Sequence, residues 1–414
     1  KQFKTNGRVI ATRPFLFSGY VVEKNAMTPE AKILLGAVRD LAPSVIARSA
    51  EIDAARRLPL DLLGQLTAAG CFRMFVPKSH GGLDIDVPAS MEIIETLASA
   101  DGSTGWVVMI GSETPMFLAL LSRKHFDDLY ANGPDVIIAG GFAPRGQAEL
   151  VDGNYRVSGR WGFASGCQHS QWLFGNCIVM ENGTPRGGVI PGTAEARAMM
   201  FAPSKAQILD TWSVNGLRGT GSHDIAVENL TVPTDDSFDI FFGRPCIETP
   251  SMAEPLLYAA LHIGAVAIGI AQRAITEIVA LANTNKRRLY ASASLAESPL
   301  FQYRVGHADA SLRAARNLVR SHADAVWNSA VAGNPVSIEG RAPVMAAITW
   351  AVHTCAAVVD TCYKAGGGTS PYDGSPLQRC MRDIQTLTQH AAVAESWLTT
   401  AGATILGRPT GFSV

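Results

Sequence analysis

The spacing of apolar residues divides the chain into three zones. From 27 to 133 they recur every three or four residues, which places them on one face of α-helices. From 134 to 245 apolar and polar residues alternate between Gly and Ser breaks, as in half-buried antiparallel strands joined by turns. From 246 to 414 the helical spacing returns in longer runs. The pattern predicts a mainly α protein with a β insert, and these three ranges are its expected domains.

Start and stop signals refine the first zone. Thr28 is suited to cap a helix N-terminus, Pro29 suits a first helical turn, and Gly70 stands where a helix is expected to end. Further along, the pattern predicts one helix over 87–111 and another over 113–133.

The β zone combines flat apolar side chains with a small hydroxyl. Trp161, Phe163 and Trp212 alternate with polar residues, and Ser165 lies beside two of them. This chemistry suits a planar ring with polar edges, although ordinary aromatic packing in a β-core explains it equally well. Gly140, Gly141 and Gly146 around Pro144 predict a loop whose amides face a ligand oxygen, or, as the commoner explanation, turn glycines with positive φ.

The third zone predicts an antiparallel four-helix bundle with short links. Its helices are apolar on more than one side, which favours an oligomer. The apolar run from 255 to 271 is only about the minimum length of a membrane span and contains His262, so a buried bundle helix is the preferred interpretation. The expected helices cover 254–289, 300–333, 342–368 and 376–407.

Composition narrows the class of protein. A chain of 414 residues predicts two or three packed regions, and a net charge of -1 with 47% hydrophobic residues indicates a soluble protein with no basic face for nucleic acid. Seven cysteines, without a C-x-x-C pair or a His cluster at ligand spacing, favour a cytoplasmic protein without a metal site. Residues 1–26 are interpreted as a non-native or extension segment.

Six segments in order carry a resemblance to a known family. They are PKSHGG, ADGSTGWV, AGGFAPRG, SGRWGFASGCQHSQW, DTWSVNGLRGTGSHD and GGGTSPYDGSPLQRCMRDIQTLTQH. From about residue 28 onward the chain resembles the acyl-CoA dehydrogenase superfamily, and within it the oxygenase components of two-component flavin monooxygenases. The resemblance implies an N-terminal helical domain, a central β-barrel or sandwich and a C-terminal four-helix bundle.

The resemblance also implies a flavin site between the β domain and the bundle. Ser165 matches the hydroxyl that contacts flavin N5, while Arg288 and Gln302 are expected to reach the flavin of a neighbouring subunit in a homotetramer. Asp383 is expected to be structural, together with Ser375 and Arg382. The residues expected to line the ring or its tail are Phe142, Gly146, Trp161, Phe163 and Trp212.

Departures from the dehydrogenases favour oxygenation. The stretch after the RD motif, where a Glu base is expected, reads TLTQHAAV and offers His390 but no acid. The resemblance then implies reduced flavin, FAD or FMN, that reacts with O2 to a C4a-hydroperoxide. Neutral His390 would deprotonate a phenol or orient an indole N–H; the alternative is a satisfied core histidine. No nicotinamide fingerprint is visible, so a separate NAD(P)H:flavin reductase is the expected partner.

The substrate pocket is expected between the first helical domain and the bundle. Its candidate residues are Trp106, Met116, Leu257 and His262, which are mostly apolar and favour a small, flat aromatic substrate such as an indole or phenol. Nitrogen or sulfur oxygenation by the same fold remains an alternative, as does a flavin oxidase or dehydrogenase of acyl-CoA type. A third alternative is a helical scaffold that has lost its cofactor.

Overall fold

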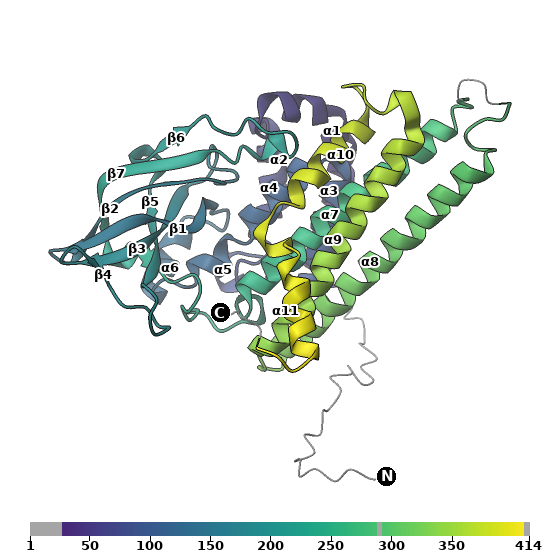
Figure 1. Ribbon diagram of the computed structural model, residues 1–414. Helices are drawn as coiled ribbons and strands as arrows, with labels where there is room; N and C mark the ends of the chain where they lie inside the picture. The colour runs from purple at the N-terminus through teal and green to yellow at the C-terminus, as the bar shows by residue number, and fades with distance from the viewer. Residues whose placement is uncertain (1–26, 288–291, 410–414) are drawn as a thin grey trace, which may run out of the picture.

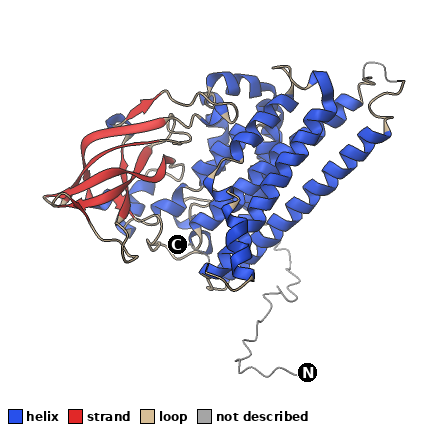
Figure 2. Ribbon diagram, viewed as in Figure 1, coloured by secondary structure: helices blue, strands red, loops and turns tan. Residues whose placement is uncertain are grey.

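The computed structural model describes residues 27–287 and 292–409 and separates a sheet from a helical body (Figure 1). Figure 2 shows the strands at one end, the long helices of the C-terminal part at the other, and N-terminal helices between them. One large apolar core is shared by the N-terminal and C-terminal helices. The sheet has a second, smaller core. The fold class predicted from the sequence is confirmed.

The N-terminal helices begin and end at the expected signals. Thr28 Oγ1 accepts the backbone N–H of Ala31 at 3.2 Å, Pro29 is the first helical residue, and Gly70 ends the second helix with φ at 101°. The helices are α1 (Pro29–Ala55), α2 (Leu60–Ala69), α3 (Val87–Ala100), α4 (Gly102–Ser112), α5 (Thr114–Leu118) and α6 (Arg123–Tyr130).

Two predicted helices of this zone are each split in two. Asp101 has an extended backbone, and its carboxylate accepts the backbone N–H of Thr104 at 2.8 Å. It therefore ends α3 and caps α4, so the single helix expected over 87–111 is wrong. The helix expected over 113–133 also breaks, because the hydroxyl of Ser122 accepts the N–H of His125 at 3.3 Å and starts α6.

The eight strands form one sheet in the order β6-β7-β2-β1-β3-β5-β8, with β4 beside β3. The pairs are antiparallel, as the sequence predicts, except that β1 runs parallel to β3. The strands are β1 (Ile138–Val151), β2 (Asn154–Trp161), β3 (Trp172–Glu181), β4 (Thr184–Pro185), β5 (Ala196–Phe201), β6 (Gln207–Leu209), β7 (Asp224–Pro233) and β8 (Ser237–Phe238).

The glycine-rich segment expected to be a loop lies inside β1. Gly141 pairs with Gly175 and Gly146 with Cys177, so the segment 142–145 bulges out of the ladder opposite the single residue Asn176. Gly140, Gly141 and Gly146 are not among the residues with positive φ, so the turn explanation is also wrong. They are glycines because a Cβ would collide with a neighbouring side chain or strand.

The bundle contains α7 (Pro255–Ala282), α8 (Pro299–Val331), α9 (Ile338–Gly366), α10 (Pro376–Leu387) and α11 (Ser396–Ile405). The last predicted helix, 376–407, is wrong as one piece, because it divides between α10 and α11. At the break His390 has φ of -72° and ψ of 136°, and its Nδ1 accepts the backbone N–H of Ala392 at 3.2 Å. A histidine that caps a new turn thus interrupts the helix.

Two helices, α7 and the segment Glu339–Thr369 around α9, are long and apolar enough to cross a membrane by length and composition. In each, 61% of the apolar window is buried inside the protein. Core helices of soluble proteins pass the same test. Their burial supports the interpretation of 255–271 as part of a bundle helix.

Candidate active site

Ser165 lies in the segment that follows β2, at the junction of the sheet with the helical body. Its side chain is 8% exposed. The segment is folded tightly. The N–H of Ser165 donates to the carbonyl of Phe163 at 2.8 Å, and the N–H of Gly166 donates to the carbonyl of Thr220 at 3.0 Å. Phe163 and Gly166 both have positive φ, 64° and 77°. This turn fixes where the Ser165 hydroxyl points.

Trp106 joins Ser165 to His390. From α4, its indole N–H donates to Ser165 Oγ at 3.1 Å. Its ring lies edge-on to the imidazole of His390, with centroids 5.5 Å apart and planes at 64°. The structure thus brings together one predicted residue from each of the three zones of the chain.

His390 is crowded by protein yet reaches solvent. His390 is exposed, while enough protein surrounds its ring that burial lowers its pKa below the usual histidine range. Because Nδ1 accepts the N–H of Ala392, the neutral ring carries its proton on Nε2.

A chain of hydroxyl groups continues from Ser165 into the protein. Ser165 Oγ lies 2.7 Å from Ser222 Oγ, which lies 2.7 Å from Thr220 Oγ1. Thr220 in turn donates to the carbonyl of Leu217 at 2.8 Å. The sequence interpretation missed Ser222 and Thr220; the signal was the run of small hydroxyl residues in RGTGSHD.

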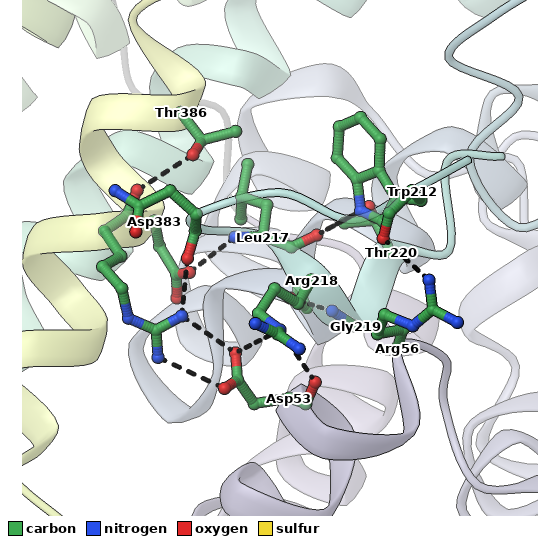
Figure 3. A network of polar contacts seen from close by, with 12 residues as sticks. Asp53, Arg56, Trp212, Leu217, Arg218, Gly219, Thr220, Asp383 and Thr386 are labelled. Carbon is green, nitrogen blue, oxygen red and sulfur yellow. Dashed lines mark hydrogen bonds and ion pairs between the residues drawn. The ribbon is translucent and has the colours of Figure 1, made fainter. Parts of the chain in front are cut away.

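The loop that carries this chain is held by helices on both sides (Figure 3). The Leu217 N–H donates to Asp383 Oδ1 of α10 at 2.6 Å, and the Leu217 carbonyl also accepts the indole N–H of Trp212 at 3.0 Å. Gly219 N–H donates to Ser103 Oγ of α4 at 3.1 Å. Burial, with the nearby charge of Asp101, raises the pKa of Asp383 to about 7. Asp383 thus ties α10 to the loop through the backbone of Leu217.

Two of the predicted aromatic residues stand at the surface, and one of them, Phe163, contacts Trp212 of this loop. Phe163 is 74% exposed, and its ring lies edge-on to that of Trp212 with centroids 6.1 Å apart. Phe142, in the β1 bulge, is 39% exposed and lies edge-on to Phe117 of α5 at 5.3 Å. These rings offer apolar faces to a flat ligand, in keeping with their predicted role.

Trp161 is placed differently from Phe163. Its side chain is 1% exposed, and its indole N–H donates to the carbonyl of Asn176 at 2.6 Å. Cβ atoms added at Gly146, Gly159 and Gly175 would lie 2.3, 2.5 and 2.4 Å from this ring. Trp161 and Gly146 therefore belong to the packing of the sheet core.

The other predicted pocket residues lie in the helical core. Met116, Leu257 and His262 are buried, and the structure does not bring them to Ser165 by any direct contact. His262 lies between Ser90 Oγ, 2.9 Å from Nε2, and Glu113 Oε1, 2.8 Å from Nδ1. Burial raises the pKa of Glu113 above its usual range.

The two predicted contacts to a neighbouring subunit have different outcomes. Arg288 lies outside the described residues. Gln302 is exposed on α8, where its amide donates to the carbonyl of Ala296 at 2.8 Å. Within residues 27–287 and 292–409, no group of His, Cys, Asp and Glu side chains is arranged to hold a metal ion.

Comparisons with known proteins agree with this architecture. Residues 28–122 match the family model described as acyl-CoA dehydrogenase, N-terminal domain, and residues 261–395 match the model for its C-terminal domain. The chain is 34% identical to indole-3-acetate monooxygenase of Pseudomonas putida over 92% of this chain and 95% of that protein. It is 29% identical to the flavin-dependent monooxygenase oxygenase subunit HsaA of Rhodococcus jostii, over 85% and 92%.

A comparison with a solved structure also supports this architecture. The crystal structure of 3-HSA hydroxylase from Rhodococcus sp. RHA1 superimposes with a TM-score of 0.84 at 28% identity, and the match covers 91% of this chain and 97% of that one. The chain therefore belongs to the acyl-CoA dehydrogenase superfamily, in its branch of flavin-dependent monooxygenase oxygenase components.

Proposed function

We propose that this chain uses reduced flavin, FAD or FMN, and O2 to hydroxylate a flat aromatic substrate of indole or phenol type. The observation that carries the proposal is the junction at Trp106, whose indole bonds Ser165 and contacts His390. Trp106 thereby holds a buried hydroxyl and a titratable imidazole on one indole ring. The names of the relatives, which act on indole-3-acetate or are flavin-dependent, support this substrate class and cofactor.

The residues present fit a flavin. Exposed Phe163 with Trp212 beside it offers apolar surface for a planar ring, and the Ser165 hydroxyl lies at the inner end of the same loop. When bound, reduced flavin supplies the electrons that activate O2. Ser165 would hold the proton at N5, and the indole of Trp106, which bonds the Ser165 hydroxyl, would keep water from that hydroxyl.

His390 accepts the proton of a phenol hydroxyl, or orients an indole by accepting a hydrogen bond from its N–H. To do so through Nε2, the imidazole changes to the tautomer with its proton on Nδ1 and gives up the bond from Ala392 N–H. That loss costs about 1 kcal/mol. General base catalysis contributes about a hundredfold or more in rate, which is about 2.7 kcal/mol, so the exchange leaves a net gain.

Dehydrogenation is disfavoured by the lack of a base. Residues 386–393 after the RD motif include no carboxylate, and the alternative position on α7, around Leu257–Leu261, is apolar and buried. Abstraction of an α-proton from an acyl thioester requires such a group.

The proposed partners follow from the cofactor. Because no nicotinamide fingerprint is visible in the sequence, electrons arrive on flavin reduced by a separate NAD(P)H:flavin reductase. The seven cysteines are free thiols, in keeping with the proposed cytoplasmic location, without nucleic-acid or membrane partners.

The proposed assembly is a homotetramer formed through the bundle. Large apolar side chains remain exposed on its helices, among them Leu300 and Tyr303 of α8 and Trp350 of α9. Such surface is typical of subunit contacts. Sedimentation velocity is expected to give a tetramer, and a monomer that binds flavin contradicts this assembly.

Product analysis tests the function. The protein is incubated with a panel of indoles, phenols and thiophenes, a generic flavin reductase, flavin and NADH. We expect hydroxylated products only when the reductase is present and little NADH oxidation by the protein alone. Turnover of an acyl-CoA, or oxidation of sulfur in thiophenes without hydroxylation of indoles or phenols, contradicts the proposal.

A further inference from the structure

The hydrogen bonds around Ser165 have a fixed direction. A carbonyl oxygen only accepts, so the Thr220 hydroxyl donates its one proton to the Leu217 carbonyl. Thr220 Oγ1 therefore accepts a hydrogen bond from the Ser222 hydroxyl, 2.7 Å away, so the one proton of Ser222 points to Thr220. Ser222 Oγ must then accept from Ser165, also 2.7 Å away.

Trp106 fixes the other side of Ser165. An indole N–H is only a donor, so it occupies one of the two lone pairs of Ser165 Oγ. The Ser165 proton points to Ser222, and one lone pair of Ser165 remains available. Toward a ligand Ser165 is therefore an acceptor. We call Trp106, Ser165, Ser222 and Thr220 the hydroxyl relay; all of these side chains are buried.

Reversal of the relay is unfavourable. If the Ser165 hydroxyl donated toward a ligand, one buried hydroxyl, that of Ser222 or of Thr220, would no longer accept the hydrogen bond that it accepts now. The far end does not adapt, because the Leu217 carbonyl also accepts from Trp212, and the Leu217 N–H is held by Asp383. Gly216 beside it packs so tightly on α10 that an added Cβ would lie 2.0 Å from the Arg382 carbonyl oxygen.

This direction discriminates between redox forms of a flavin. N5 of reduced flavin carries a hydrogen and donates, whereas N5 of oxidised flavin presents a lone pair and accepts. An acceptor at Ser165 complements the first and opposes the second. We propose that the hydroxyl relay makes the site selective for reduced over oxidised flavin, with Ser222 and Thr220 as positioning residues. The proposal rests on the proposed function, because it takes N5 to lie at Ser165.

Two variants abolish the fixed direction of the hydrogen bonds in the relay, and both change residues that are not proposed to contact the flavin. Ser222→Ala frees the Ser165 proton, and Thr220→Val frees the proton of Ser222 to turn toward Ser165. In both, Ser165 becomes able to donate to oxidised flavin. Thr220→Ser keeps the relay. Ser170→Ala is the matched control, because Ser170 is a neighbouring buried serine whose hydroxyl donates to the Cys167 carbonyl, outside the relay.

The measurement is the dissociation constant of each variant for reduced and for oxidised flavin, under anaerobic conditions and without substrate. We expect wild type to bind the reduced form more tightly. The ratio of the two constants should fall about tenfold in Ser222→Ala and Thr220→Val, as expected for one hydrogen bond, and persist in Thr220→Ser and Ser170→Ala. Circular dichroism and melting temperatures check that each variant is folded.

The ratio of the two dissociation constants distinguishes a role in flavin selectivity from a merely structural role. A merely structural role weakens both forms equally, so an unchanged ratio in the two relay variants overturns the proposal, as does a wild type that binds both forms equally. If wild type still hydroxylates aromatic substrates, the proposed function survives that result. A wild type that binds neither form contradicts the proposed function itself.

Discussion

Trp106 holds its indole edge-on to the imidazole of His390, with the ring centroids 5.5 Å apart. The same indole donates its N–H to Ser165. One side chain of α4 therefore fixes the distance between a residue at the end of the β2 turn and a residue at the break after α10.

The first prediction concerns Trp106→Phe. Phenylalanine keeps an aromatic edge near His390 but cannot donate to Ser165. Loss of one hydrogen bond of about 1 kcal/mol should lower the yield of product per O2 consumed roughly fivefold, with hydrogen peroxide as the balance. Trp106→Leu, which also removes the contact with His390, should lower it further. Equal coupling in wild type and Trp106→Phe contradicts this role.

The second prediction concerns His390. His390→Ala should still bind reduced flavin, but oxygen transfer should slow by about a hundredfold or more. Because burial lowers the pKa of His390, the neutral form of the imidazole predominates at neutral pH. The wild-type transfer rate should be flat through pH 7 and fall only below about pH 6.5, the usual histidine value. A pH profile shared by wild type and mutant would make His390 a structural residue.

The third prediction uses the pKa of Asp383. Its folded value is about 7 against an unfolded value near 4, so the folded protein binds the extra proton between these values. Stability contributed by this group is therefore highest at low pH and falls as pH rises from about 4 to 7. Asp383→Asn, which still offers an oxygen to Leu217 N–H, should lose this slope. Denaturant unfolding at pH 5 and pH 8 measures it, and equal slopes in both proteins contradict the shift.

The fourth prediction concerns the packing of Gly146 against the Trp161 ring in the sheet core. Gly146→Ala places a Cβ 2.3 Å from the Trp161 ring and 2.7 Å from Cys177 Sγ, so it should destabilise the protein by about 3 kcal/mol. Gly187→Ala is the control, because nothing lies within 4 Å of its added Cβ. Thermal unfolding compares the two. Similar melting temperatures would show that the Trp161 packing yields without cost.

The order of the elements could be predicted from the sequence because it depends on local patterns. The spacing of apolar residues and the cap at Thr28 are local, and so is the stop at Gly70. The break at Asp101 was missed although the sequence marks it, because Asp is a preferred N-cap residue and Gly102 follows it. The break at His390 was missed because no Pro or Gly stands there. At both breaks a side chain caps a new turn.

The site could be predicted only in part, for a physical reason. Alternation locates Trp161 and Phe163 on or near a strand, but it does not say which of them the sheet core encloses. The glycines around Trp161 come from three strands, and their closeness is set by pairing between those strands. The hydroxyl relay joins side chains distant in sequence, and the choice of partner depends on how α4 and α10 pack against the loop.

The most direct test of the central claim is a single turnover with labelled oxygen. The protein is loaded anaerobically with chemically reduced flavin and an indole or phenol that the product analysis identifies, and then mixed with ¹⁸O₂. No nicotinamide or reductase is present. We expect one ¹⁸O atom in the hydroxylated product and formation of oxidised flavin. Product that lacks the label, or labelled hydrogen peroxide with no hydroxylated product, contradicts the account.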